Sequence, residues 1–187
     1  MPRNVHISVI KICVMQNIIP IFFDLDFSSE TGHHKPITKK WLENVFKKIN
    51  FNEQKIVGVI LVSPTYHGYA EDLQPLIDLC HQKNLPVLVD EAHGSYFLFC
   101  ENLNLPKSAL ISNADLVVHS LHKSLNGLTQ TAALWYKGNL VNEQNLIKSI
   151  NLLQTTSPSS LLLSSCEESI KDWLNKKSLS KYQKRIL

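Results

Sequence analysis

The chain has 187 residues, and its formal net charge of +3 is spread along it apart from a basic C-terminal tail, which argues against a nucleic-acid partner. Hydrophobic residues make up 44% of it, which excludes a disordered protein because such a composition can build a buried core. No apolar run reaches the ~20 residues of a membrane span, and no signal peptide or close cysteine pair is present, so we expect a cytoplasmic protein with no membrane partner and no metal site.

Helical and strand patterns alternate along the chain. Helices are predicted at residues 7–16, 38–50, 71–83, 142–153 and 159–176. Strands are predicted at residues 18–24, 56–62, 86–90, 115–119 and 131–136. The second and third of these strands are apolar on both faces, as a sheet covered by helices on both sides requires. The pattern therefore predicts an α/β fold with three layers and a mostly parallel sheet of about five strands.

Three polar segments directly follow predicted strands, at residues 63–68, 90–94 and 120–123. In parallel sheets, functional groups collect just past the carboxyl ends of the strands. The shared placement of these segments makes each of them a candidate part of one active site.

The segment at residues 90–94 reads Asp-Glu-Ala-His-Gly. One interpretation is the DEAH motif of an ATP-driven helicase, in which the carboxylates hold magnesium. That chemistry also needs a Gly-x-x-x-x-Gly-Lys-Ser/Thr loop for the phosphates, and the sequence has none. We therefore discount the helicase interpretation.

Lys123 by itself is typical of an exposed lysine in a polar loop. Two features favour a functional role: Ser120 and His122 beside it can both contact a phosphate, and Asp90 lies about one strand–helix–strand unit earlier. An aspartate and a lysine at neighbouring strand ends can hold the two ends of a pyridine ring. The lysine amine forms an imine with a ring aldehyde, and the aspartate keeps the ring nitrogen protonated.

Several motifs occur together and in a consistent order. They read RNVHISV, VSPTYHG, VDEAHG, VHSLHKSLNGLTQTAAL and LLQTTSPSSLLLSS. In this order and spacing they resemble the Orn/Lys/Arg decarboxylase family, which is pyridoxal-phosphate dependent and has the aspartate-aminotransferase type of fold. The resemblance covers about residues 3–165 and is more specific than any single motif.

The resemblance implies a role for each site residue. Lys123 would be the Schiff-base lysine and, with His6, a catalytic residue, while Asp90 would pair with the pyridinium nitrogen of pyridoxal 5'-phosphate. The further cofactor contacts that it implies are His6 stacked on the ring, His93 near the phenolic side, Ser120 and His122 at the phosphate, and Thr156 approaching the cofactor of a neighbouring subunit.

The sequence departs from the family pattern at both ends. Family members carry a Gly-Ser/Thr turn before the RNVH position, where backbone amides bind the phosphate, and a C-terminal domain that helps close the site. We therefore interpret residues 1–157 as a partial cofactor-binding large domain and residues 158–187 as a helical segment with a basic tail. We also expect a homo-oligomer or a complementing chain.

Two functions follow from the resemblance. The first is decarboxylation of ornithine, lysine or arginine to an amine and CO₂, as in polyamine biosynthesis. The second is a truncated, catalytically impaired remnant or assembly partner of such a decarboxylase. An aminotransferase or aldolase on the same fold is a weaker third alternative.

Overall fold

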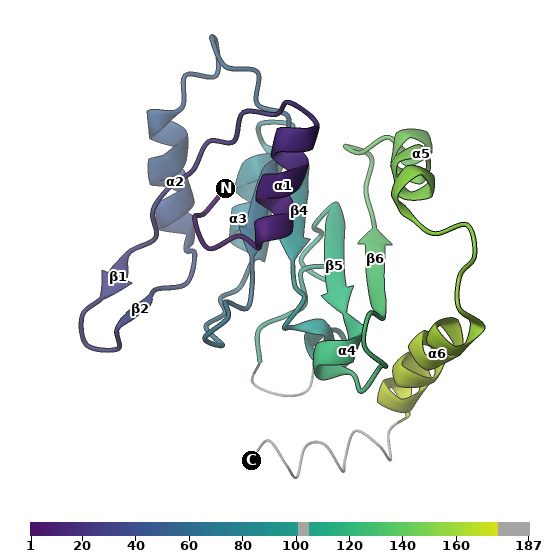
Figure 1. Cartoon of the computed structure of the whole chain (residues 1–187). Helices are drawn as coiled ribbons and strands as arrows, with labels where there is room; N and C mark the ends of the chain where they lie inside the picture. The colour runs from purple at the N-terminus through teal and green to yellow at the C-terminus, as the bar shows by residue number, and fades with distance from the viewer. Residues whose placement is uncertain (101–104, 176–187) are drawn as a thin grey trace.

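The computed structural model of the chain describes residues 1–100 and 105–175 (Figure 1). The helices are α1 (Ile7–Met15), α2 (Lys39–Lys48), α3 (Gln74–His81), α4 (Leu121–Ser124), α5 (Glu143–Leu153) and α6 (Ser160–Leu174), with a 3-10 helix η1 at Ser95–Phe99. The strands are β1 (Phe27–Ser28), β2 (His33–His34), β3 (Val59–Val62), β4 (Val87–Asp90), β5 (Leu116–Ser120) and β6 (Ala132–Tyr136). The basic tail predicted within residues 158–187 lies outside the described residues.

The main sheet has four strands in the order β3-β4-β5-β6. The first three are parallel, and β6 runs antiparallel to β5. In the parallel register, Val62 pairs with Asp90 and Asp90 pairs with Val118, so these strands end together. The predicted α/β fold with a mostly parallel sheet is confirmed.

The strand predicted at residues 18–24 is wrong. This segment makes only an isolated parallel bridge between Pro2 and Phe23, supported by hydrogen bonds from Phe23 N to Met1 O and from Arg3 N to Phe23 O. Pro20 has no N–H to donate to a ladder. The described part of the sheet therefore has four strands instead of about five.

The helices begin at residues that suit the first turn. The hydroxyl of Thr38 accepts from Trp41 N at 3.1 Å, and the side chains of Asn142 and Ser159 cap α5 and α6 in the same way. Pro75 lies in the first turn of α3, where its missing N–H costs nothing, and α3 begins later than the predicted residue 71.

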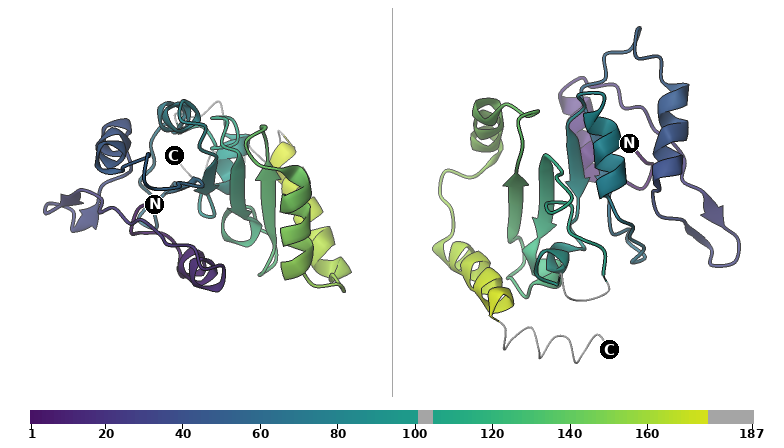
Figure 2. Two further views of the ribbon diagram at one scale, coloured as in Figure 1. Left: turned by 90° about the horizontal axis from the view of Figure 1, so that it is seen from above. Right: turned by 180° about the vertical axis from the view of Figure 1, so that it is seen from behind.

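The hydrophobic core lies between the sheet and the pair α2 and α3. Leu42, Leu61, Ile77, Val87 and Val117 are fully or almost fully buried in it. Figures 1 and 2 show α1 and α3 on opposite sides of the sheet, while α5 and α6 lie beyond its β6 edge. The core thus fixes β3, β4 and β5, whose carboxyl ends carry the predicted site.

No helix among the described residues combines the length and the apolar character that a bilayer span requires.

Candidate active site

The candidate site lies where β4 and β5 end, at one edge of the sheet. Asp90 is the last residue of β4 and pairs in register with Val118 of β5. β5 ends at Ser120, and the short helix α4 begins with the next residue and carries Lys123. Since the strands are parallel, their carboxyl ends bring the two polar segments to the same edge, as the sequence predicts.

The amine of Lys123 contacts His93 across this edge. Its Nζ lies 3.2 Å from Nε2 of His93, although the two residues are 30 positions apart in the sequence. The ring of Tyr66 packs edge-on against the His93 ring at a centroid distance of 5.6 Å. The three polar segments predicted from the sequence therefore meet at His93.

Burial and nearby charges together determine the pKa of His93. Burial lowers the pKa of the imidazole below its ordinary value, and the nearby Lys123 ammonium lowers it further. The Asp90 carboxylate raises this pKa and His6 lowers it, but both effects are smaller. His93 is therefore neutral at neutral pH, and Lys123, Asp90 and His6 all lie close enough to influence its pKa.

The turn after β4 is held by its own short contacts. Oδ1 of Asp90 accepts from Ala92 N at 3.1 Å, which orients the half-buried carboxylate. A Cβ at Gly94 would lie 2.5 Å from Cδ of Pro64 and 2.9 Å from Cγ of Glu91. Only glycine allows the turns after β3 and β4 to approach this closely.

Ser120 and His122 form the side of the site that was predicted to meet a phosphate. Ser120 is 9% exposed, and its carbonyl accepts a long hydrogen bond of 3.4 Å from Ser95 Oγ. Nδ1 of His122 lies 2.8 Å from the carbonyl oxygen of Thr131 and must donate to it. His122 could therefore donate to an anion only through Nε2, and only as an imidazolium.

The donor set at the strand ends matches pyridoxal phosphate at its ring end. Lys123 offers an amine and Asp90 offers a carboxylate, at the ends of adjacent strands. Ser124 adds a buried hydroxyl for which the described residues offer no hydrogen-bond partner. A polar atom left unsatisfied next to the lysine fits a site that takes a polar ligand.

The two remaining predicted contact residues, His6 and Thr156, are exposed. His6 is exposed at the start of α1, where its Nδ1 accepts from Ser8 N at 3.3 Å and lies 2.8 Å from Ser8 Oγ. Thr156 is exposed in the connection between α5 and α6, beside Thr155, whose hydroxyl accepts from Ser157 N. His6 stacking on a ring and Thr156 facing a neighbouring subunit stay predictions.

A buried network behind the site was missed by sequence reasoning. The Glu91 carboxylate accepts from Ser108 Oγ at 2.6 Å and Ala109 N at 2.8 Å, and it lies 2.7 Å from Nε2 of His119. Trp135 Nε1 donates to Nδ1 of His119 at 2.9 Å. The available signal was a histidine inside the apolar strand β5, because a polar residue buried in a sheet needs a partner.

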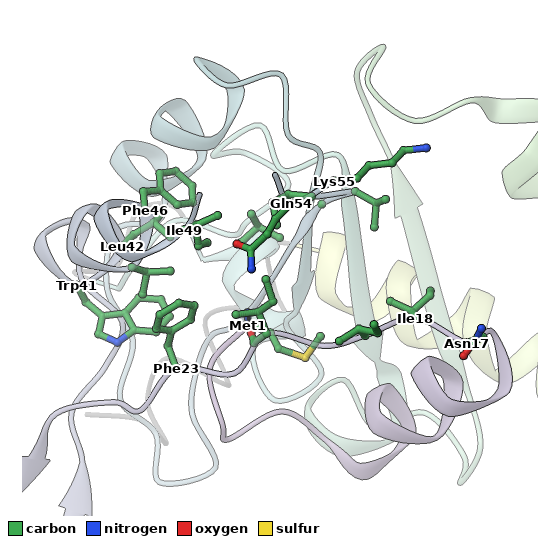
Figure 3. A pocket seen from close by; sticks show the side chains of 17 residues that line it. Met1, Asn17, Ile18, Phe23, Trp41, Leu42, Phe46, Ile49, Gln54 and Lys55 are labelled. Carbon is green, nitrogen blue, oxygen red and sulfur yellow. Dashed lines mark hydrogen bonds between the residues drawn. The ribbon is translucent and has the colours of Figure 1, made fainter. Parts of the chain in front are cut away.

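A cavity of about 500 Å³ lies elsewhere, at the amino-terminal end of β3 (Figure 3). Its lining includes Met1, Phe23, Trp41 and Val59, and it is mostly apolar. None of the predicted site residues lines it. It is therefore separate from the strand ends that carry the polar cluster.

His33 stacks on His67 with ring centroids 3.9 Å apart. Within residues 1–100 and 105–175, no group of three or more His, Cys, Asp or Glu side chains could hold a metal ion.

Comparison with known proteins points to one family. The family model described as "Orn/Lys/Arg decarboxylase, major domain" matches residues 1–186. An arginine decarboxylase of Bacillus cereus is 37% identical over 166 residues, covering 89% of this chain and 35% of the relative. An arginine decarboxylase of Bacillus subtilis is also 37% identical over 166 residues, covering 89% and 33%. The chain thus spans about a third of the length of these relatives.

Solved structures agree on the fold. A variant of serine palmitoyltransferase from S. paucimobilis, with a bound pyridoxal phosphate–myriocin aldimine, matches with a TM-score of 0.63 at 15% identity, over 93% of this chain and 42% of that one. A sphingosine-1-phosphate lyase of Burkholderia pseudomallei matches with a TM-score of 0.65 at 14% identity, over 92% and 41%. The domain therefore has the architecture of pyridoxal-phosphate-dependent fold type I enzymes.

Proposed function

The chain belongs to the Orn/Lys/Arg decarboxylase family, and we propose that it carries the lysine-bearing part of a pyridoxal-phosphate-dependent amino-acid decarboxylase. The substrate is a basic amino acid, namely ornithine, lysine or arginine, and the products are an amine and CO₂. The names of the curated relatives favour arginine among the three. The observation that carries the proposal is the 3.2 Å contact between Lys123 Nζ and His93 Nε2, beside the strand end that holds Asp90.

Each residue of the cluster has a chemical task in this proposal. When bound, pyridoxal phosphate supplies an aldehyde for an amine and a pyridinium ring that accepts electrons. Asp90 holds the proton on the ring nitrogen. Neutral His93 can accept a hydrogen bond at Nε2 from Lys123 Nζ and so orient the amine, which attacks an aldehyde only when it is deprotonated.

The phosphate end of the site is less complete. In this proposal Ser120 and His122 meet the phosphate dianion, and His122 must be protonated to donate a second hydrogen bond. We therefore expect pyridoxal phosphate to bind this chain weakly. Decarboxylation by the chain alone is then slow or absent.

A second candidate function is that of a remnant or assembly partner, and one observation favours it. α5 has no buried residue, and Leu152, Leu153 and Leu161 are each more than half exposed. Among the described residues, β6 pairs on one side only, with β5. Exposed apolar side chains and an open strand edge together favour a protein that works with a second copy or a complementing chain.

Product formation tests the proposal. CO₂ release from arginine, lysine and ornithine is measured with pyridoxal phosphate, for the wild type and for Lys123→Ala. Lys137→Ala is the matched control, because Lys137 bonds to Asn113 at the opposite end of the sheet. We expect slow release from arginine that Lys123→Ala abolishes and the control retains. Release that survives Lys123→Ala would contradict the assignment, and release at the rate of a complete decarboxylase would contradict the remnant alternative.

A further inference from the structure

Glu91 is a buried carboxylate with a full set of donors. It is 1% exposed. Oε1 accepts from Ala109 N at 2.8 Å, and Oε2 accepts from Ser108 Oγ at 2.6 Å and from His119 Nε2 at 2.7 Å. Three donors converging on one carboxylate can offset the cost of burying its charge.

Trp135 determines which nitrogen of His119 carries the proton. The indole N–H can only donate, and it lies 2.9 Å from Nδ1 of His119. Nδ1 must therefore accept, which leaves the proton on Nε2 to be donated to Glu91. A directed chain of hydrogen bonds thus runs from β6 through β5 to the residue that follows β4.

The two ends of this chain adjoin the candidate site. Glu91 directly follows Asp90, and its backbone N–H donates to Val118 O at 3.0 Å, while His119 directly precedes Ser120 at the end of β5. We propose that Glu91 and His119 are positioning residues, which set the placement of Asp90 relative to Lys123. This proposal rests on the proposed function of the same site.

Asp115 offers a matched control within the same sheet. It is 2% exposed, and its Oδ2 accepts from Val87 N at 2.8 Å and lies 2.9 Å from His81 Nε2. The pair therefore has the same chemistry, but it lies at the amino-terminal ends of β4 and β5. A variant of Asp115 disturbs a buried carboxylate–histidine pair without touching the candidate site.

Glu91→Gln is the direct test. Glutamine keeps the shape of the side chain, but its amide nitrogen cannot accept a hydrogen bond. Whichever way the amide turns, that nitrogen faces a donor, either Ala109 N–H or His119 Nε2–H. The turn after β4 must then shift. Asp115→Asn also replaces a buried carboxylate by an amide, but both donors to Asp115 meet Oδ2, so the amide oxygen can accept from both and the backbone there need not move.

Two readouts separate this proposal from the proposed function. Without cofactor, the ring NMR signals of His93 report its contact with Lys123; we expect them to move in Glu91→Gln and to stay in Asp115→Asn. With pyridoxal phosphate and borohydride, we expect the initial labelling rate at Lys123 to fall at least ~10-fold in Glu91→Gln alone, because misplacement by about 1 Å can cost ~100-fold in rate. If even the wild type is not labelled, the proposed function fails while the NMR comparison still tests the positioning.

A second variant keeps the test informative if Glu91→Gln folds poorly. Trp135→Phe removes the N–H that holds Nδ1 of His119 as an acceptor. In the double variant with Glu91→Gln, His119 can move its proton to Nδ1 and accept the amide at Nε2. We expect the double variant to regain the wild-type His93 signals that Glu91→Gln loses.

The proposal is overturned by either of two results. One is an equal change of the His93 signals and of Lys123 labelling in Glu91→Gln and Asp115→Asn, which would mean that both pairs only stabilise the fold. The other is a double variant with Trp135→Phe that is no better than Glu91→Gln, which would contradict the direction of the hydrogen-bond chain.

Discussion

The two ends of strands β4 and β5 carry similar buried pairs but different surroundings. At the carboxyl end, Glu91 and His119 are both almost completely buried. At the amino end, Asp115 is buried, but the side chain of His81 is 31% exposed. Each pair joins groups that are far apart in the sequence, so each holds neighbouring parts of the fold together.

Only the carboxyl end places such a pair beside reactive groups. Lys123, His93 and Asp90 gather there, whereas Asp115 links the end of α3 to the first residue of β4. A buried carboxylate–histidine pair is therefore not by itself a sign of an active site. The chemistry next to it, at the carboxyl ends of parallel strands, makes the difference.

The largest expected effect comes from truncating the two carboxylates. Glu91→Ala leaves three buried donors without an acceptor and should lower the free energy of unfolding by about 3–5 kcal/mol. Asp115→Ala should cost less, about 1–3 kcal/mol, because water can reach the half-exposed His81. Urea unfolding of both variants measures this difference in the free energy of unfolding. Equal losses in the two variants would contradict the prediction that the carboxyl-end pair contributes more.

Gly94 and Gly58 lie near the carboxyl and amino ends of the strands, and alanine at each position should have a different effect. In Gly94→Ala the new Cβ would lie 2.5 Å from Cδ of Pro64, so we expect a loss of about 1–3 kcal/mol and reduced labelling of Lys123. In Gly58→Ala, before β3, the closest atom is Pro86 O at 3.1 Å, which requires a smaller adjustment. Gly94→Ala should therefore lower the melting temperature more than Gly58→Ala does, and labelling of Lys123 should be normal in Gly58→Ala.

The apolar surface beyond β6 is a third region, and its changes should hardly affect stability. Leu153 is 67% exposed in α5, so Leu153→Glu should change the free energy of unfolding by no more than about 0.5 kcal/mol. The same change should reduce self-association, because it adds a charge to an apolar face. Light scattering against concentration checks this; a wild type that is already a stable monomer would contradict it.

The smallest effect concerns pH and His93. Burial, and then Lys123, lower the pKa of His93 from its ordinary value of 6.5. The unfolded chain therefore binds a proton at His93 more tightly than the folded chain does. The stability that neutral His93 contributes to the fold is present above pH 6.5 and is lost as pH falls through the folded-state pKa. The stability difference between the wild type and His93→Asn should shrink from pH 7.5 to pH 5.5 in urea unfolding. A difference that grows at low pH would show the opposite sign.

The sequence was sufficient to predict the parallel strands and the polar segments after them. The apolar runs before Asp90 and Ser120 fix where two strands end, and parallel pairing then brings those ends together. The helix α4 was missed because four residues are too few to show a period. The strand predicted at residues 18–24 failed because an apolar run becomes a strand only where a partner strand is available.

The network behind the site could not be predicted from local patterns. Glu91 and His119 are 28 residues apart, and Trp135 lies on a third strand. No spacing rule links such residues, because their contact depends on the register of β4, β5 and β6. Sequence reasoning therefore predicted residues that would meet a cofactor, but it did not predict the pair that we propose to position them.

The proposed function depends most directly on the attachment of pyridoxal phosphate to Lys123. The purified chain is incubated with pyridoxal phosphate, reduced with borohydride and digested, and the labelled peptide is identified by mass spectrometry. We predict a visible absorbance band of low intensity and a label on Lys123 that is absent from Lys123→Ala and present in Lys137→Ala. A label confined to other lysines, or labelling unchanged in Lys123→Ala, would contradict the assignment of the site.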